Sequence, residues 1–338
     1  RKSNSRFWHD RDRPLPHDVV VVDETSMASL SLMARLLDAV RPDARVVLVG
    51  DPDQLASVEA GSVLADVVGD GATTADDLGA GLVVLRRPHR FGADSGIGRL
   101  ARAVRDGDAD AVVDHLRRRD DLDWVETSVP LADDLDGVRS LLVDRGAAMA
   151  AAARGGDVDG ALDHLGRAAV LCAHRRGRDG VAGWNHLVDG WLAQDVDGWH
   201  PREPWQPGRA VLATGNDRQL QVFNGDLGVV VTTDAGLRVA FHRAGSGGPP
   251  PVPPVRLEHA DPVHAMTIHK SQGSQWDHVV VVLPGEGSRI LTRELLYTAV
   301  TRAASRLTLI GDEAVVRQAV ARPVRRASGL GRRLWGTP

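Results

Sequence analysis

Hydrophobic positions at the start of the chain predict a strand, a helix and a second strand. Val19 to Glu24 has the sequence VVVVDE, and residues 44–51 have the sequence ARVVLVGD. Continuous β-branched runs of this kind are typical of parallel strands that are buried on both faces. Between them, apolar residues recur at helical spacing, at Leu32, Leu36, Leu37 and Val40. The pattern therefore predicts an open α/β sheet, with a further strand at residues 81–87, GLVVLRR.

The middle of the chain changes pattern twice. Residues 98–166 are charged and rich in alanine, which predicts helices, and residues 168–174 then return to a buried-strand pattern before a helix at 177–192. Residues 205–255 hold short β-rich runs separated by Asn-Asp, Asn-Gly-Asp and Asp-Ala-Gly turns. Such turns favour a small antiparallel barrel.

The last part returns to the α/β pattern after a Gly-Pro-rich spacer at residues 245–254. We predict strands at 264–269, 278–284 and 306–312 and a helix at 292–303. A β-module is thus inserted into an α/β domain. Residues 315–338 are basic, and we expect a solvated end there.

Composition narrows the class of protein. A length of 338 residues with 43% hydrophobic composition suits two or three compact units, and the absence of a long apolar run predicts no membrane partner and a cytoplasmic location. The single cysteine, Cys172, excludes an intrachain disulfide and makes metal or redox chemistry improbable. The net charge of −4 leaves a local DNA-binding groove open.

Polar residues follow the first two predicted strands directly. Asp23 and Glu24 end the first, while Asp51 and Gln54 follow the second. Ligands of open α/β sheets lie outside the carboxyl ends of the strands, so these side chains are expected to share one crevice. Such a set suits a nucleoside triphosphatase: one acid holds Mg²⁺, the other polarises the attacking water, and the amide senses the γ-phosphate. An acidic strand end can also be a solubilising turn.

Phosphoryl transfer also needs cations near the developing charge. Arginine is suited to this because it stays protonated and binds oxygen atoms in pairs. Arg90 in RRPHRFG and Arg302 in YTAVTRAA are the candidates, since both flank predicted elements that face the crevice.

Six motifs in order resemble the superfamily I helicases of the RecD type, the alpha subunit of exodeoxyribonuclease V. They are VVVVDETSM, GDPDQLASVEAG, RRPHRFG, FNGDLG, TIHKSQGSQWD and LLYTAVTRA. The resemblance covers nearly the whole chain. It implies an α/β fold of RecA-like P-loop NTPase motor domains, the first one incomplete, with a small β-barrel inserted in the second.

The resemblance also implies roles for individual residues. Asp23 and Glu24 would serve Mg²⁺ and water activation, Gln54 would sense the γ-phosphate, and Arg90 and Arg302 would be the cations from the second motor domain. ATP binding would further involve Asp51, Gly273 and Gln275, although relatives often have Glu at the position of Gln275. The residues that link the nucleotide to DNA would be Thr267, His269, Lys270, Ser271, Gln272 and Gly273.

Lys270 and the aromatic residues carry the predicted DNA contacts. Lys270 is one of only two lysines, and a compact ammonium can reach a backbone phosphate where a planar guanidinium is too bulky. Asn224 is a further candidate, with Phe223 and Trp276 as stacking faces for bases. An aromatic residue beside a glycine turn is also often part of a core.

The predicted domain boundaries follow from the motifs and the resemblance. Residues 1–80 are the C-terminal part of the first motor domain, 81–200 and 259–314 are the two segments of the second, 201–258 form the inserted barrel, and 315–338 are the basic tail.

The phosphate-binding loop Gly-x-x-x-x-Gly-Lys-Ser/Thr is not found in the printed sequence, where neither Lys2 nor Lys270 follows a glycine. We expect truncation to account for this, since in the family the loop precedes VVVVDE. The 338-residue chain is then expected to bind ATP poorly, to be inactive alone, and to expose apolar faces around Val19 to Val22 and Val46 to Val49, through which it would aggregate.

The principal functional hypothesis is an ATP- and Mg²⁺-dependent motor that moves 5′ to 3′ on single-stranded DNA. It would unwind duplex DNA during break repair together with RecB-like and RecC-like subunits, and the direction and partners come from the resemblance alone. Two alternatives stay open. One is a non-catalytic DNA-binding or scaffolding subunit that has lost its phosphate loop, and the other is a stand-alone RecD-like or conjugative helicase.

Overall fold

The computed structural model divides the chain into two compact units. Unit 1 comprises Arg1–Arg87 with Pro323–Pro338, and unit 2 comprises Pro88–Arg322. The structure describes residues 7–57, 61, 63–69, 81–85, 92, 94–118, 120–127, 133–242, 250–324 and 329–335. Among these residues, no helix is both long and apolar enough to cross a lipid bilayer.

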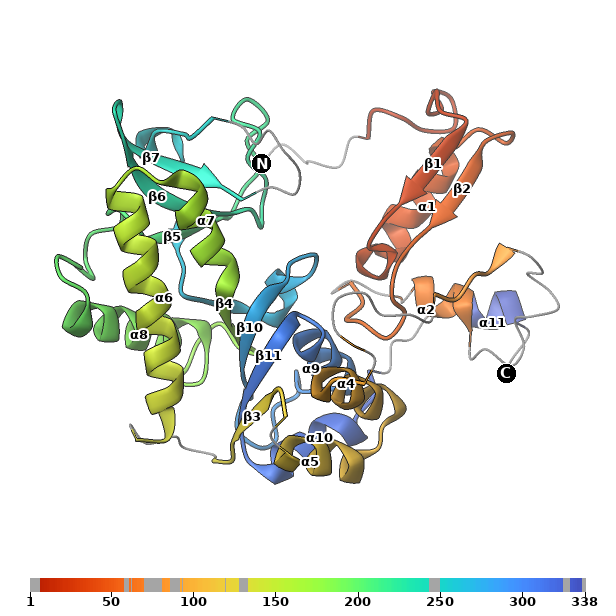
Figure 1. Cartoon of the computed structure of the whole chain (residues 1–338). Helices are drawn as coiled ribbons and strands as arrows, with labels where there is room; N and C mark the ends of the chain where they lie inside the picture. The colour runs from red at the N-terminus through yellow and green to blue at the C-terminus, as the bar shows by residue number, and fades with distance from the viewer. Residues whose placement is uncertain are drawn as a thin grey trace. The chain divides into compact units, whose positions relative to one another are not determined.

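Unit 1 contains the predicted strand, helix and strand (Figure 1). Strands β1 (Val19–Val22) and β2 (Arg45–Leu48) pair in parallel, with Val19 opposite Arg45 and Val22 opposite Leu48. Helix α1 (Leu30–Ala39) connects them and begins where the Ser29 hydroxyl accepts the amide N–H of Leu32, as an N-cap residue should. The short helices of this unit are η1 (Thr25–Met27), α2 (Val63–Val68) and α11 (Leu330–Trp335).

The two-stranded sheet of unit 1 leaves apolar side chains in solvent. Val19 is 54% exposed, Val21 61%, Val47 37% and Val49 42%. The expected uncovered valine faces are therefore confirmed. The further strand expected at residues 81–87 is wrong for the residues described there, because 82–85 have no regular structure and Leu85 is 87% exposed. Four adjacent apolar residues do not make a strand without a partner.

Unit 2 is built on a parallel five-stranded sheet in the order β3-β11-β10-β4-β9. Its strands are β3 (Leu122–Val125), β4 (Ala168–Cys172), β9 (Ala265–Thr267), β10 (Trp276–Val282) and β11 (Ala303–Ile310). Strands β9, β10 and β11 confirm the three strands predicted after the spacer, and β4 confirms the strand predicted at residues 168–174. Strand β3 lies in the region that the alanine-rich pattern assigned to helices.

Helices cover both faces of this sheet (Figure 1). On one side α6 and α8 pack on β4, β9 and β10 through a core that includes Leu142, Val188 and Leu192, all with no exposed surface. The helices are α4 (Gly96–Asp106), α5 (Ala109–Arg118), α6 (Asp136–Arg154), α7 (Val158–Arg167), α8 (Val181–Asp195), α9 (Arg293–Val300) and α10 (Glu313–Ala321).

The predicted β-module is a four-stranded antiparallel sheet in the order β7-β6-β5-β8, which we call the inserted sheet. Its strands are β5 (Ala210–Ala213), β6 (Leu227–Thr233), β7 (Gly236–Phe241) and β8 (Ala260–Pro262). It has a core of its own, which includes Val211, Val230 and Val239. Helices α6 and α7 lie against β6. A parallel α/β unit interrupted by a β-module is therefore the fold of this part of the chain.

The expectation of a solvated end from residue 315 onward is wrong for the first residues of that segment. Helix α10 buries Val315, Val316, Ala319 and Val320 in unit 2. These residues recur at helical spacing, which the basic composition of residues 315–338 obscured. The predicted domain boundaries themselves stay predictions.

Candidate functional site

The turn after β1 holds Glu24 in an unusual backbone conformation. Glu24 has φ 48° and ψ 42°, in the left-handed region that residues other than glycine, asparagine and aspartate rarely adopt. The carboxylate of Asp23 accepts the amide N–H of Glu24 at 2.8 Å, and the amide N–H of Thr25 donates to the carbonyl of Val49 at 2.9 Å. Such strain persists where the surroundings enforce it, and it is common at functional sites.

The turn after β2 lies at the same edge of the sheet, because the two strands are parallel and adjacent. Asp51 accepts the side-chain amide of Gln54 at 3.1 Å and the backbone N–H of Asp53 at 3.0 Å. Gly50 has to be a glycine: an added Cβ would lie 2.8 Å from the Leu64 side chain and 3.1 Å from the Thr25 nitrogen. The structure thus brings Asp23, Glu24, Asp51 and Gln54 to one edge of the sheet, as predicted from the strand pattern.

These carboxylates fit a Mg²⁺ ion that takes only part of its ligands from the protein. Within the described ranges, no group of three or more His, Cys, Asp or Glu side chains could hold a metal by itself. Mg²⁺ usually takes one or two protein carboxylates and completes its shell with waters and substrate phosphates. The exposed Asp23 therefore fits an ion that arrives with a nucleotide.

In unit 2, the TIHKSQG motif forms a compact turn between β9 and β10. The short helix η5 (Ile268–Ser271) starts where the Thr267 hydroxyl accepts the amide N–H of Lys270 at 3.3 Å. The Ser271 hydroxyl donates to the carbonyl of Ile268 at 2.8 Å, and Gly273 turns the chain with φ +78°. Thr267 and Ser271 are buried, so their hydroxyls stabilise the turn.

The other motif residues are more open to solvent. His269, Lys270 and Gln272 are half-buried, and Gly273 and Gln275 are exposed. Among the described residues, the Lys270 side chain has no ion-pair partner. Its ammonium group is thus placed to meet an anion.

Arg302 lies behind this motif with no exposed surface. Its Nε donates to the Thr298 carbonyl at 3.1 Å, and one terminal nitrogen donates to the Ser274 carbonyl at 3.3 Å. The backbone carbonyl of Arg302 in turn accepts the amide N–H of Trp276 at 3.1 Å. The guanidinium therefore holds the motif in place from within, and its role towards a nucleotide stays a prediction. The second predicted cation, Arg90, lies outside the described residues.

The inserted sheet carries the predicted DNA contacts at a turn before β6. Asn224 is exposed, its amide N–H donates to the Asn216 side-chain carbonyl at 2.8 Å, and Phe223 is 42% exposed. Trp276 is only 4% exposed, so the prediction that it stacks on a base is wrong. Its ring is part of the core of unit 2, which is the alternative that a neighbouring glycine turn also favoured.

Sequence reasoning missed a crevice at the carboxyl ends of β4 and β10. After β4 the chain continues, through α8 and the inserted sheet, to β9 on one side. After β10 it continues to β11 on the other side, so the loops that follow the neighbouring strands β4 and β10 diverge. A cavity of about 470 Å³ lies there, and Arg176, Arg178 and Arg289 are among its lining residues. The His174 Nε2 and the Ser288 hydroxyl bridge the loops at 2.9 Å. The RRGR sequence after a predicted strand was the signal that could have found it.

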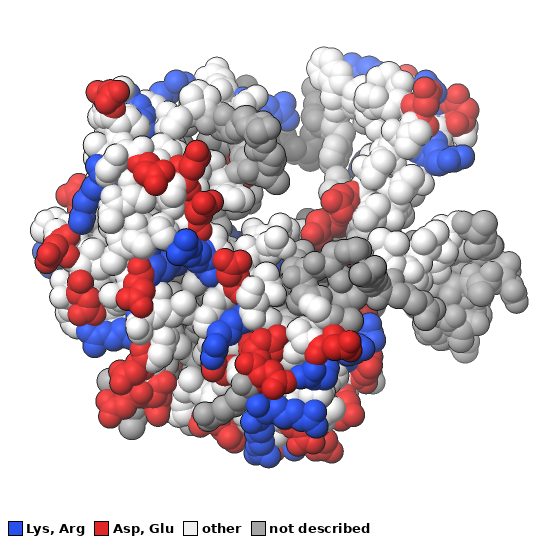
Figure 2. Space-filling model, viewed as in Figure 1, with Lys and Arg blue, Asp and Glu red and all other residues white. Residues whose placement is uncertain are grey.

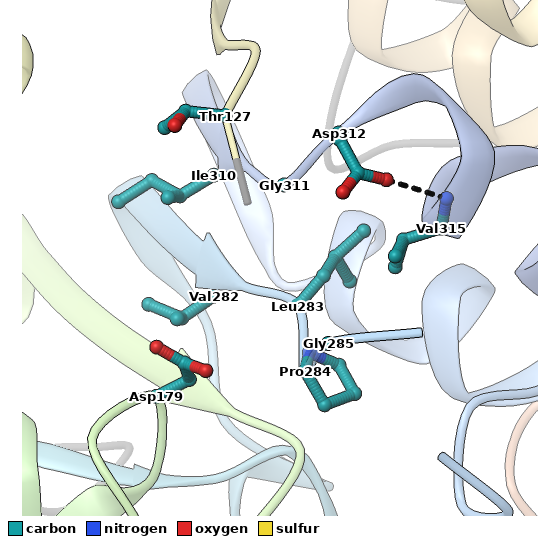
Figure 3. Close-up of a pocket in the computed structure, with 10 residues that line it drawn as sticks. All are labelled: Thr127, Asp179, Val282, Leu283, Pro284, Gly285, Ile310, Gly311, Asp312 and Val315. Carbon is teal, nitrogen blue, oxygen red and sulfur yellow. Dashed lines mark hydrogen bonds between the residues drawn. The ribbon is translucent and has the colours of Figure 1, made fainter. Parts of the chain in front are cut away.

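Two features limit what this edge can bind. A neighbouring cavity at the ends of β10 and β11 has a volume of only about 10 Å³, and Asp312 beside it is occupied in capping α10 through the amide of Val315 at 2.8 Å (Figure 3). On the face drawn in Figure 2, basic and acidic side chains are interspersed over unit 2. Because neither sign of charge dominates this face, anion binding there depends on arginines that lie close together.

Two family models match the chain. An AAA domain matches residues 4–127, and a UvrD-like helicase C-terminal domain matches residues 262–310. With the parallel α/β sheet and its inserted β-module, these matches indicate a RecA-like fold of the kind found in helicases.

The relatives narrow this class to one family. The RecBCD enzyme subunit RecD of Mycobacterium tuberculosis is 51% identical over 99% of this chain and 56% of its own length, and that of Mycolicibacterium smegmatis is 49% identical over 98% and 57%. The ATP-dependent RecD2 DNA helicase of Deinococcus radiodurans is 31% identical over 94% of this chain and 39% of its own length. This chain is therefore similar, over nearly its whole length, to RecD-type superfamily I helicases. It spans about half the length of the RecD relatives.

Proposed function

We propose that this chain provides motor elements of an ATP-dependent DNA helicase that moves 5′ to 3′ on single-stranded DNA. It would act with RecB-like and RecC-like subunits, as the names of its RecD relatives suggest, and its role would be in double-strand break repair, as the family resemblance implies. The observation that carries the proposal is the strained Glu24 beside an exposed Asp23 at the end of a parallel strand. A solubilising turn has no need for a left-handed glutamate.

In the proposed mechanism, the residues of unit 1 act on the nucleotide. Asp23 would hold a Mg²⁺ ion, which would supply charge neutralisation for the phosphates. The turn directs the Glu24 carboxylate to polarise the attacking water, while the Gln54 amide, oriented by Asp51 at 3.1 Å, senses the γ-phosphate.

The residues of unit 2 grip DNA in this proposal. Lys270 contacts a backbone phosphate. The arginines of the crevice add phosphate contacts at the end of β4, the strand next to β9; they are Arg176, Arg178 and Arg289. Phe223 offers a face for one base, and Asn224 offers a hydrogen bond. Since these contacts go to phosphates and to base faces, the proposed grip has no sequence preference.

ATP turnover tests the nucleotide half. A longer version of the protein that carries a Gly-x-x-x-x-Gly-Lys-Ser/Thr loop should hydrolyse ATP with stimulation by oligo(dT), and Glu24→Gln should reduce kcat by about 100-fold or more. Asp12→Asn, a change in an exposed acid of the same unit, serves as the control and should leave kcat unchanged. Normal DNA-stimulated turnover in Glu24→Gln would remove the proposed role.

DNA binding tests the other half with the 338-residue chain itself. Fluorescence anisotropy with labelled oligo(dT) should show affinity that falls with salt, and the double variant Arg176→Ala, Arg178→Ala should bind at least tenfold more weakly with a shallower salt slope. Arg118→Ala removes another exposed arginine of unit 2 and should change little. The same loss of binding free energy per removed arginine in both variants would mean that net charge alone attracts the DNA.

ATP binding by the same chain tests the expectation that the nucleotide site needs a phosphate loop. Isothermal titration with ATP and Mg²⁺ should show no binding in the micromolar range. Micromolar affinity would contradict it.

A second candidate is a stand-alone helicase, which the 31% identity to RecD2 favours. Affinity purification of the tagged protein from its own cells distinguishes the two. Recovery of RecB-like and RecC-like subunits in equal amounts supports the complex, and recovery without them supports the stand-alone enzyme.

A further inference from the structure

A buried polar cluster connects the inserted sheet to the rest of unit 2. Asp189 on α8 is its centre: the Arg209 guanidinium donates to the two Asp189 oxygens at 3.0 and 3.2 Å, and the Trp199 indole N–H donates at 2.8 Å. The Nε2 of His264 lies 3.4 Å from the same carboxylate. We call Asp189, Trp199, Arg209 and His264 the joint.

The joint gathers both chain connections of the inserted sheet. Trp199 and Arg209 belong to the segment that leads into β5, whereas His264 immediately precedes β9, where the chain returns. Arg209 also donates to the carbonyl of His200 at 3.0 Å, and its guanidinium lies 4.7 Å from the centre of the Trp199 ring. One carboxylate therefore ties the exit and the return together.

Helix α8 holds the return strand at a second point. The Asn185 side-chain carbonyl accepts the amide N–H groups of His264 and Ala265 at 2.7 and 2.8 Å. Asn185 and Asp189 are four residues apart and so lie on one face of the helix. The same face thus fixes the start of β9, whose end carries the TIHKSQG motif, and the first residues of the inserted sheet.

The charges of the joint are poorly hydrated. Arg209 is 1% exposed and His264 is 6% exposed, while the side chain of Asp189 is 19% exposed. Burial alone would raise the pKa of Asp189, but hydrogen bonds from His264, Trp199 and Arg209 lower it to about 2. A buried charge pair of this kind requires its particular geometry, because any displacement leaves a charge without a partner.

We propose that Asp189 is a positioning residue that fixes the inserted sheet against β9, so that the DNA contacts of the sheet and of the TIHKSQG motif move as one rigid body. Neither Asp189 nor its partners touch DNA or nucleotide in this proposal. The inference rests on the proposed function for its purpose, but the rigidity itself can be measured without ATP or DNA.

Distance measurements between two spin labels test the rigidity. Ala193→Cys on α8 and Ala235→Cys in the β6–β7 turn are both exposed, and burial of Cys172 raises the pKa of its thiol, which keeps it unreactive. The labelled 338-residue chain should give one narrow distance. Asp189→Asn should replace it with a broad distribution, whereas Val188→Ala, which removes buried apolar volume one residue away, should leave it narrow.

Two results would overturn the proposal: an unchanged narrow distance in Asp189→Asn, or equal broadening in Val188→Ala. If Asp189→Asn does not fold, Arg209→Lys decides, since it keeps the charge but cannot contact the Asp189 carboxylate and the His200 carbonyl through two separate nitrogens, and it should also broaden the distribution. A narrow distance in that variant would overturn the proposal as well.

The consequence for DNA follows from the same variants. Two DNA-contacting surfaces that move separately bind more weakly than one preorganised surface. Asp189→Asn should therefore lower the affinity for oligo(dT) by about tenfold. Unchanged affinity in a variant with a broad distance distribution would show that the grips act independently and would overturn the rigid-body part. If the unmodified chain binds no DNA while its distance is narrow, the proposed function fails and the joint stands.

Discussion

The same four-valine sequence occurs twice in this chain with different outcomes. In β1, Val19 and Val21 are 54% and 61% exposed, whereas in β10 Val279 to Val281 have no exposed surface. Strand β1 has one partner in a two-stranded sheet, and β10 lies between β4 and β11 with helices over both faces. A β-branched run thus predicts a strand in both places, but burial depends on the number of neighbours that cover it.

An aspartate in each strand gives the sharpest contrast. Val280→Asp puts a charge into a fully buried position and should cost more than about 4 kcal/mol, enough to unfold unit 2. Val21→Asp should change the free energy of unfolding by about 0.5 kcal/mol or less, because the side chain is already in solvent. Urea unfolding followed by circular dichroism measures both. Similar losses would mean that the two sheets are equally covered in solution.

Arg302 provides the next largest expected effect. Replacing it by alanine leaves the carbonyls of Thr298 and Ser274 without their charged donor and opens a cavity, at a cost of about 3 kcal/mol. A fall in ATP turnover in this variant would therefore reflect a folding defect as well as any loss of a role of Arg302 in ATP hydrolysis. The variant Arg302→Lys keeps a cation, and a stable Arg302→Lys protein without ATP turnover would indicate a direct role towards the nucleotide.

Acid should affect unit 2 through Asp189. A folded-state pKa of about 2 against the ordinary 3.8 corresponds to about 2 kcal/mol, because each pKa unit is worth about 1.4 kcal/mol. Since this pKa is lowered in the folded state, the contribution is present above about pH 4 and is lost as the pH falls towards 2. Unfolding free energies at pH 7, 5 and 3 should show the difference between wild type and Asp189→Asn shrinking only at the lowest pH. A constant difference would mean that the charge contributes nothing.

The smallest expected effect is a gain in unit 1. Glu24→Gly removes the left-handed strain and should raise the free energy of unfolding of unit 1 by about 1 kcal/mol. Glu24→Gln keeps the strain and should change stability little. The comparison is made by thermal unfolding of both variants. Stability that is unchanged in Glu24→Gly would show that the turn is not strained.

Much of the fold follows from local patterns. The buried runs at β2, β4, β10 and β11 and the turn-rich inserted sheet are continuous signals, so the sequence alone predicts them. Strand β3 was missed because its four residues, LDWV, are interrupted by the charged Asp123 and lie inside an alanine-rich region. Helix α10 was missed because most of it lies in residues 315–338, whose basic composition predicted a solvated end.

The candidate site was only partly predictable, for a different reason. Motif order selected Glu24, Lys270 and Arg302 as candidates, but no motif shows that Arg302 is fully buried or that Glu24 is strained. The joint had no local signal, since Asp189 lies 20 residues from Arg209 and 75 from His264. Contacts at such separations arise only once the chain has folded.

The half-buried Lys270 has a practical consequence because the chain contains only one other lysine, Lys2. Acylating reagents that modify primary amines will find Lys270 almost alone within unit 2, so mass spectrometry of one modified peptide gives a protection assay. Shielding of that amine by an oligonucleotide, and its return at high ionic strength, would report occupancy of the motif without any engineered label.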